Sequence, residues 1–310
     1  MLLDKKQSKR SMLVSIMNAL SYDLGSGIDD ITESDEQVQK KILSLGAGVQ
    51  SSACLLMSCY GELDRLDAAI FADTGWETKA TYRWLEFLKS ESEKYGIPIH
   101  VVKGRDLKQD ALVSQVRGLK SDGNRHASMP LFTLGPNGEK GMIKRQCTSE
   151  YKLRVIEKKQ REIAGYKKYA RIPTGAVEVW VGISTDEANR AKISDKKWYS
   201  FYYPLIELRM SRRDCRNWFA KNGLPQPPRS SCIGCPYHSD KEWRHLRDNS
   251  PDEWQEAVEF DRAIRKCGGM RGDVFIHSQR VPLDQVDLRT DQDKGQLSLF
   301  RNECAGVCGV

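Results

Sequence analysis

The sequence lacks the marks of membrane and exported proteins. The 310-residue chain contains no run of about 18 apolar residues, the length that a membrane-spanning helix needs, so we expect no membrane association. The N-terminal stretch MLLDKKQSKRSMLVSIMNAL places basic residues before an apolar patch, but Asn18 and Ser21 interrupt that patch and acidic residues follow it. This pattern is unlike a signal peptide, and we expect a cytoplasmic protein. The nucleotide motifs GxxxxGKS/T and GxGxxG are also missing.

What the sequence does contain is nine cysteines and a net charge of +7. Disulfide scaffolds with many cysteines are typical of small secreted proteins. In a chain of this length without an export signal, the cysteines predict metal, cluster or redox chemistry instead. The positive charge suits polyanionic ligands such as a nucleotide, sulfate or a nucleic acid, and it does not choose among them.

Regular elements begin at Lys41. The short apolar strand KKILSL leads through GAGVQS into SSACLLMSCY, which has helical spacing, and LDAAIFADTG is predicted as a buried strand. An amphipathic helix follows from Lys79 to about Tyr95, and the strand IPIHVV follows Gly96. Alternating strands and helices predict an α/β fold with a parallel sheet and helices on both faces. Ligands of such sheets bind beyond the carboxyl ends of the strands.

Later segments predict further elements and a division into domains. Residues 104–145 are polar and glycine-rich, which predicts a long functional loop. A basic helix from about Ser149 to Ala164, the strand VEVWVGIS, and helices starting at Ser211 and spanning about Asp240 to Lys266 follow. We expect an N-terminal extension that docks a partner protein, a main α/β domain, and a helical and irregular segment with a cysteine-bearing tail, at residues 1–38, 39–235 and 236–310.

The segment Ser44–Ser52 joins the first predicted strand to the first helix. Its small residues let the backbone approach a phosphate, and the helix N-terminus supplies unpaired N–H groups and partial positive charge. Ser51 and Ser52 add hydroxyl donors. An ordinary glycine-rich turn is the alternative. Because the next strand ends in Asp73 and a tight turn, where a ligand for a ribose or for Mg²⁺ would lie, a nucleotide-binding domain is favoured.

This loop, SLGAGVQSS, resembles the pyrophosphate loop of the adenine nucleotide alpha-hydrolase superfamily, the PP-loop ATP pyrophosphatases, whose usual form is SGGxDS. It is closer to the phosphoadenosine-phosphosulfate-reductase-like family, in which a Gly-x-Gln-Ser type loop replaces the aspartate. DTGWET, GISTDEANR and YPLIELRMSRRDCRNWFAKNGLP resemble further motifs of that family, in order between about Lys41 and Tyr237. The resemblance implies ATP or a related adenine nucleotide, bound by Ser44, Gly46, Gly48, Gln50, Ser51, Ser52, Asp73, Thr74, Gly75, Gly182, Glu187 and Arg190.

The sharpest cysteine signal is Cys232-Ile-Gly-Cys235-Pro, because a turn of this spacing brings two thiolates to one side, where they can bind a metal or cluster. Cys147 starts the basic helix, where positive charge favours a reactive thiolate. Adenylylsulfate reductases and some tRNA thiolases of the family hold a [4Fe-4S] cluster with similar cysteines. The resemblance implies Cys147, Cys232 and Cys235 as ligands; Cys215, Cys304, Cys308 or a non-protein group could be the fourth, and we assign Cys308. Structural zinc and no metal are the alternatives.

The tail NECAGVCGV resembles the Glu-Cys-Gly-type end of phosphoadenosine-phosphosulfate reductases, whose thiol attacks sulfur. This resemblance implies Cys304 as a catalytic thiol, with Cys147 and Asp73 as further catalytic candidates. The two thiols of the tail could instead complete the metal site or be idle.

Cationic residues gather between Lys144 and Arg171 and again between Arg209 and Arg216, which predicts an anion or nucleic-acid surface or, more simply, a solvated helix face. The first expected function is an ATP-dependent adenylating sulfurtransferase that acts on tRNA or DNA, with phage defence among its settings. The second is a reductase of adenylylsulfate or phosphoadenylylsulfate that releases sulfite and is restored by thioredoxin. The third is a non-catalytic nucleotide-binding accessory protein.

Overall fold

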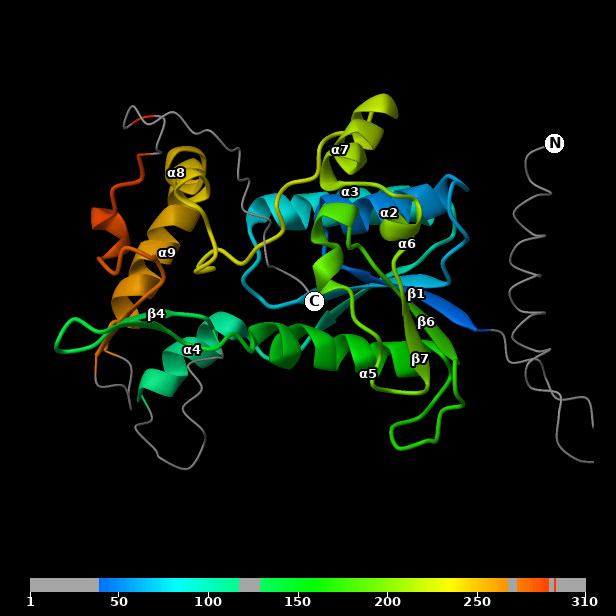
Figure 1. Cartoon of the computed structure of the whole chain (residues 1–310), viewed down its shortest axis with the longest axis horizontal. Helices are drawn as coiled ribbons and strands as arrows, with labels where there is room; N and C mark the ends of the chain where they lie inside the picture. The colour runs from blue at the N-terminus through cyan, green and yellow to red at the C-terminus, as the bar shows by residue number, and fades with distance from the viewer. Residues whose placement is uncertain (1–38, 117–128, 267–271, 290–292, 294–310) are drawn as a thin grey trace, which may run out of the picture. The chain divides into compact units, whose positions relative to one another are not determined.

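A parallel sheet lies at the centre of the computed structural model, which describes residues 39–116, 129–266, 272–289 and 293. Within these residues five strands pair in the order β3-β2-β1-β6-β7, and every pair is parallel (Figure 1). The strands are β1 (Lys40–Leu45), β2 (Ala68–Asp73), β3 (Ile99–Lys103), β6 (Val177–Val181) and β7 (Tyr199–Tyr202). The predicted α/β fold with a parallel sheet is therefore confirmed.

The central strand β1 pairs with β2 on one side and β6 on the other, so that Ile42 lies opposite both Ala68 and Val179. Because the neighbouring strands are parallel, the carboxyl ends of β1, β2 and β6 meet at one edge of the sheet. This is the edge at which the sequence predicts a ligand.

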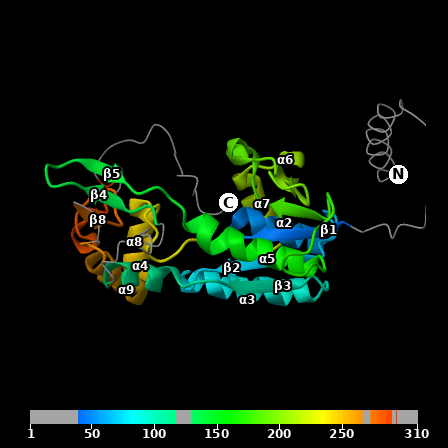
Figure 2. The same ribbon diagram turned by 90° about the horizontal axis from the view of Figure 1, so that it is seen from below.

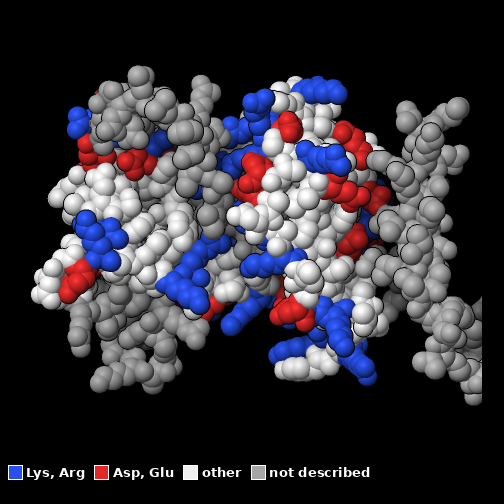
Figure 3. Space-filling model, viewed as in Figure 1, with Lys and Arg blue, Asp and Glu red and all other residues white. Residues whose placement is uncertain are grey.

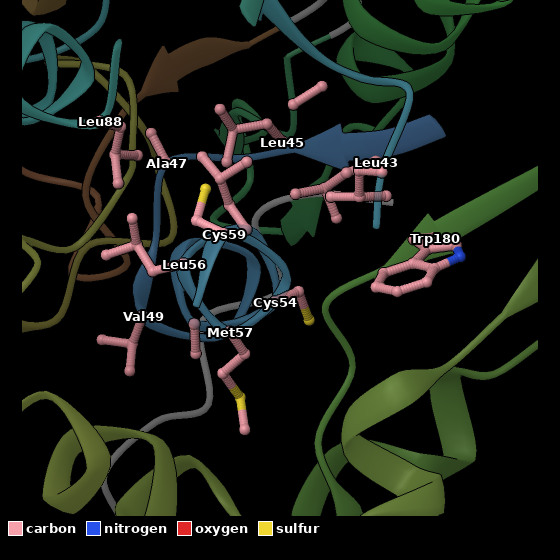
Figure 4. Packing of buried hydrophobic residues seen from close by; sticks show 14 of the residues in the cluster. Leu43, Leu45, Ala47, Val49, Cys54, Leu56, Met57, Cys59, Leu88 and Trp180 are labelled. Atoms are coloured by element: carbon pink, nitrogen blue, oxygen red, sulfur yellow. The ribbon is translucent and has the colours of Figure 1, made fainter. Parts of the chain in front are cut away.

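Helices cover both faces of the sheet, as predicted: α2 (Val49–Cys59), α3 (Lys79–Glu93), α5 (Arg154–Ile163), α6 (Pro204–Glu207) and α7 (Arg212–Lys221). On one face Leu43 and Phe71 pack in one core cluster with residues of α2, α3 and α7, while on the other Ile42 and Ile70 pack in a second cluster with Ile156 of α5. All residues of α2 are buried, and Figure 4 shows Leu56, Met57 and Cys59 around its axis.

The predicted long loop at residues 104–145 is wrong where the structure describes it. It contains α4 (Leu107–Val116) and the hairpin of β4 (Phe132–Leu134) and β5 (Lys140–Met142), and β4 also pairs with β8 (Asp273–Phe275) (Figure 2). The strand β8 lies far along the chain, so local patterns carried no signal for its pairing with β4. The β4–β5 hairpin is local, and the Gly-Pro-Asn-Gly turn at residues 135–138 was a hairpin signal that was missed. The strand β7 and the short helix α6 were also missed.

The single helix predicted from Asp240 to Lys266 is two helices, α8 (Asp240–Asn249) and α9 (Pro251–Ala263). Pro251 explains the break, because proline cannot donate the backbone hydrogen bond that would continue α8. Ser239 begins α8 with a capping box that includes Glu242. The remaining elements are the π-helical turn η2 (Thr148–Leu153) and the 3₁₀ turns η3 (Thr185–Arg190) and η4 (Leu283–Gln285). Among the described helices, none has the length and apolarity to span a membrane.

Candidate functional site

The predicted phosphate loop lies between β1 and α2, at the carboxyl edge of the sheet. Gly48 is the N-cap of α2, and its carbonyl accepts the first helical hydrogen bond, from Ser52 N at 3.0 Å. The N–H groups of the first turn therefore lack helical acceptors and point out of the helix N-terminus. The first turn contains no acidic side chain, so its partial positive charge is not offset within the helix. The Ser51 hydroxyl accepts from Gly46 N at 3.2 Å, which closes the loop on itself.

The glycines of the site serve two different purposes. A Cβ on Gly46 or Gly48 would lie 3.7 Å from Ser51 Oγ or 3.8 Å from the Ser230 Cβ, which are ordinary contacts. A Cβ on Gly182 would lie 2.6 Å from Ser51 N, closer than atoms can approach. The backbone after β6 thus presses directly on the loop and needs a glycine, whereas the loop glycines leave space on the side that a ligand would occupy.

A cleft opens in front of the loop, with an empty volume of about 920 Å³ that includes solvent at its mouth. Four cationic side chains line it, together with one acidic side chain, Glu187. The cations are Lys152, Arg190, Arg212 and Arg229. Three of these cations are each paired with one carboxylate, that of Glu77, Glu187 or Glu242, so the net positive charge at the cleft is modest. Cationic side chains beside a helix N-terminus suit a polyanionic ligand that carries phosphate groups.

Glu187 and Arg190 form an ion pair within η3, with 2.5 Å between Oε2 and Nη1. Glu187 is 4% exposed, and its second carboxylate oxygen, Oε1, is buried with no hydrogen-bond partner in the described part of the chain. Nearby, Gln50 donates from Nε2 to Ser184 Oγ at 3.4 Å. The loop and the segment after β6 are therefore joined by a side-chain bond as well as by the close contact at Gly182.

The cleft gathers eight of the twelve residues that the family resemblance implied for nucleotide binding: Ser44, Gly46, Gly48, Gln50, Ser51, Gly182, Glu187 and Arg190. Ser52, Asp73, Thr74 and Gly75 are not among the residues that line it. Ser52 is fully buried, and its Oγ accepts from Trp84 Nε1 at 2.9 Å, so this hydroxyl joins α2 to α3.

Asp73 holds the turn that follows β2. Its Oδ1 accepts from Gly75 N at 2.8 Å and from the Tyr82 hydroxyl at 2.7 Å. Burial, and then the bond to Asp73, raise the pKa of Tyr82, which keeps this phenol a donor. Gly75 has a φ of 77°, the left-handed conformation that the tight turn requires. The structure therefore uses Asp73 and Gly75 to shape the turn that leads to Trp76 and Glu77.

That turn packs directly against the Cys232–Cys235 turn. Ile233 N donates to Trp76 O at 2.9 Å, and Glu77 forms an isolated antiparallel bridge with Cys232. A Cβ on Gly234 would lie 2.1 Å from the Trp76 ring, so only glycine fits beneath the indole. The DTGWET and CIGC segments, more than 150 residues apart in the sequence, form one unit.

Glu77 is the buried centre of this unit. Its side chain is fully buried, and Oε1 accepts from Thr74 Oγ1 at 3.1 Å and from Lys152 Nζ at 3.0 Å. The Cys232 thiol lies 3.8 Å from the same oxygen and 3.4 Å from Thr74 Oγ1. Because Lys152 also lines the cleft, its ammonium links the cysteine turn to the phosphate site.

The predicted metal ligands lie on two separate segments, with Cys147 at the start of η2 and Cys232 and Cys235 in the turn. Among the described residues, no three side chains of Cys, His, Asp or Glu converge as a metal ion requires. Cys308, the assigned fourth ligand, and Cys304, the predicted catalytic thiol, lie outside the described residues, and the complete ligand set stays a prediction.

Several residues of the site were missed or only partly found from the sequence. Thr148, Lys152 and Ile156 line the cleft from η2 and α5. They are spaced four residues apart, so the basic helix predicted for this segment would already place them on one face. Arg229 and Ser230 enter the cleft from the loop before Cys232, and no local pattern marks them. Arg229 also pairs with Glu242, which anchors this loop to α8.

Comparison with known proteins gives a distant likeness. No protein-family model matches the chain, and no curated protein sequence matches it. The structure is similar to a phosphoadenylyl-sulfate (PAPS) reductase from Candida auris in a phosphate complex, with 12% identity, a TM-score of 0.39 and coverage of 61% of this chain and 75% of that one. It is also similar to the U34-tRNA thiolase NcsA from Methanococcus maripaludis with its [4Fe-4S] cluster, with 13% identity, a TM-score of 0.35 and coverage of 73% and 71%. At these values the likeness concerns the fold alone.

Proposed function

We propose that the cleft in front of Ser44–Ser51 binds ATP or a related adenine nucleotide through its phosphates, and that the chain is an enzyme that transfers the adenylyl group to an acceptor. The observation that carries this proposal is the meeting, in one cleft, of the α2 N-terminus with Lys152, Arg190, Arg212 and Arg229. Backbone N–H groups and guanidinium groups are the usual partners of phosphate oxygens.

In the proposed reaction an acceptor oxygen attacks the α-phosphorus and forms a new P–O bond. The bond from that phosphorus to the bridging oxygen breaks, and pyrophosphate leaves with the electron pair. The cations of the cleft would stabilise the charge that develops on the leaving group, which is the main contribution a protein makes to phosphoryl and nucleotidyl transfer. Mg²⁺ would be held chiefly by the phosphates, with Glu187 as the carboxylate that lines the cleft.

The acceptor favoured by the sequence is a nucleic acid, tRNA or DNA, and the cysteines would then serve sulfur transfer. In the described residues Cys147, Cys232 and Cys235 are not among those that line the cleft. We therefore assign no step of the adenylyl transfer to a thiol or to a metal. A cluster, if the chain holds one, would supply a bound sulfur for a later displacement of AMP.

The test is pyrophosphate release from ATP in the presence of a nucleic-acid acceptor, with total tRNA and single-stranded DNA as the probes. Release by the wild-type chain, and its loss in Arg212→Ala with retention in Arg213→Ala, would support the proposal. Sulfite release from phosphoadenylyl sulfate with thioredoxin, abolished by Cys304→Ser, would replace it with the reductase function. ATP binding without either product would leave the accessory role.

A further inference from the structure

A turn with an exposed tyrosine follows α5, and none of its residues lines the cleft. Residues 167–171 (Lys-Lys-Tyr-Ala-Arg) are all exposed, and Tyr169 is 90% exposed. Ala170 N donates to Lys167 O at 3.0 Å, which closes a β-turn with Tyr169 at its third position. Tyr169 has a φ of 89°, a conformation that favours glycine and is strained for an aromatic residue.

Hydrogen bonds from the Arg161 side chain stabilise the strained turn. Arg161 Nη2 donates to Lys167 O at 3.2 Å and to Ala170 O at 2.9 Å, so that one guanidinium fixes both ends of the turn. The same guanidinium lies over the Trp198 ring, 6.0 Å from its centroid. Because the surroundings hold Tyr169 in an unfavourable conformation while leaving its ring in solvent, the ring has no role in the core that would explain the strain.

The turn carries strong positive charge on and around the ring. Lys168 Nζ lies over the Tyr169 ring, 4.9 Å from its centroid. Residues 158–171 contain six Lys or Arg residues and a single acidic residue, Glu162. Arg154 and Lys158, one helical turn apart on α5, are also exposed. Figure 3 shows Lys and Arg side chains gathered over α5 and the loop that follows it.

We propose that the Tyr169 turn and the exposed face of α5 bind a single-stranded nucleic acid, with a base stacked on Tyr169 and with phosphates on Lys167, Lys168 and Arg171. An exposed aromatic ring flanked by cations is the arrangement with which proteins bind single strands, because every base has a face that can stack and every nucleotide carries a charge. Arg154 and Lys158 continue the positive surface along α5 toward Lys152 in the cleft. The turn lies outside the cleft lining, so this proposal and the proposed function can fail independently.

The experiment measures binding of fluorescein-labelled single-stranded RNA and of DNA of the same sequence by fluorescence anisotropy, against the matching duplex. We expect Tyr169→Ala to weaken single-strand binding about tenfold and Tyr169→Phe to preserve it. A triple variant, Lys167→Ala with Lys168→Ala and Arg171→Ala, should reduce the salt dependence of binding by roughly two units of slope. Lys221→Ala, an exposed lysine at the end of α7, is the matched control and should bind as the wild type does.

Tyr169→Gly separates a binding role from a structural one. Glycine relieves the strain at this φ, so the melting temperature should stay the same or rise while single-strand binding falls as in Tyr169→Ala. Unchanged binding in both variants would overturn the proposal, and so would a duplex that binds as tightly as the single strand. Binding to phosphatidylserine vesicles without binding to either oligonucleotide would also overturn it, in favour of a membrane surface.

Discussion

The sequence predicts a functional site both at the phosphate cleft and at the Cys232–Cys235 turn. The two regions differ in how far apart in the sequence the residues that form them lie. The core of the cleft is local, because β1, the loop and the N-terminus of α2 are consecutive in the chain. The cysteine turn depends on distant partners: Trp76 covers Gly234, and Glu77 contacts Cys232. Lys152 belongs to both regions, since it lines the cleft and pairs with Glu77.

This difference shows what can be predicted about each region from the sequence alone. The geometry of a loop between a strand and a helix is set by consecutive residues. The class of ligand that such a loop binds can therefore be predicted from the local sequence. A pair of cysteines has many possible surroundings, and its chemistry depends on what the fold brings beside it. The shared Lys152 means that a change at the cysteine turn can be detected at the cleft.

The largest expected effect comes from Gly182→Ala, because this variant should lose ATP binding altogether as well as stability. Its new methyl group would overlap the backbone of Ser51, so we expect the free energy of unfolding to fall by about 1–3 kcal/mol and ATP binding to be lost with the displaced loop. Gly48→Ala is the matched control, because its methyl group meets only an ordinary contact with Ser230 and its φ of −97° suits alanine. Urea unfolding and ATP titration should show normal stability but weaker ATP binding for Gly48→Ala. Equal stability of the two variants would contradict the close contact at Gly182.

The second effect concerns the link between the regions. Lys152→Met leaves the buried Glu77 carboxylate without its cation, and we expect this to cost about 3 kcal/mol of stability, measured by urea unfolding. The double variant Lys152→Met with Glu77→Gln should recover part of that loss, because no charge is then left buried. Lys158→Met, on the adjoining helix α5 and exposed, is the control and should be near neutral. Additive losses in the double variant would show that the two side chains do not act as a pair.

Third, Arg212 and Arg213 offer a matched pair at the edge of the cleft. Arg212 lines the cleft while Arg213 is exposed and does not. Arg212→Ala should weaken ATP binding about tenfold to a hundredfold, the range of a hydrogen bond to a charged group. Arg213→Ala should leave the affinity within about twofold, because an exposed charge is screened by solvent. Isothermal titration of both variants decides between them, and an equal loss would place the phosphates elsewhere.

Some elements of the fold and of the site could be predicted from the sequence, and others could not. The strand KKILSL, the loop and the parallel character of the sheet were predictable because hydrophobic periodicity and loop chemistry are local, whereas the order of the strands was not predicted. Eight of the implied nucleotide residues line the cleft, but Ser52 joins α2 to α3 through Trp84, and Asp73 shapes a turn. Neither partner, Trp84 or Tyr82, could be paired with them from spacing alone. The pairing of β4 with β8 was missed for the same reason, since the two strands meet across more than 130 residues.

The smallest effect is a contrast in thiol reactivity. Burial raises the pKa of Cys59 to about 11 and that of Cys215 to about 12, and it raises the pKa of Cys54 well above its usual value. At pH 8 only about one in a thousand Cys59 thiols is ionised, so alkylation of these three should need unfolding. The half-buried cysteines of the two segments should react in the folded chain, as mass spectrometry after iodoacetamide treatment would show: Cys147, Cys232 and Cys235.

Iron and zinc analysis of anaerobically purified protein completes the thiol experiment. Protection of all three half-buried cysteines, together with bound iron or zinc, would show that these cysteines bind a metal. The remaining ligand would then come from outside the residues that the structure describes. Native alkylation without metal would remove the cluster from the account while leaving the cleft unaffected.

The most direct measurement of the central claim is a calorimetric titration of the wild-type chain with ATP and, separately, with adenosine. If the cleft binds phosphates through the α2 N-terminus and its four cations, ATP should bind at least a hundredfold more tightly than adenosine, roughly 3 kcal/mol, and inorganic pyrophosphate should compete with it. Adenosine that binds as tightly as ATP, or pyrophosphate that fails to compete, would contradict a phosphate site at Ser44–Ser51.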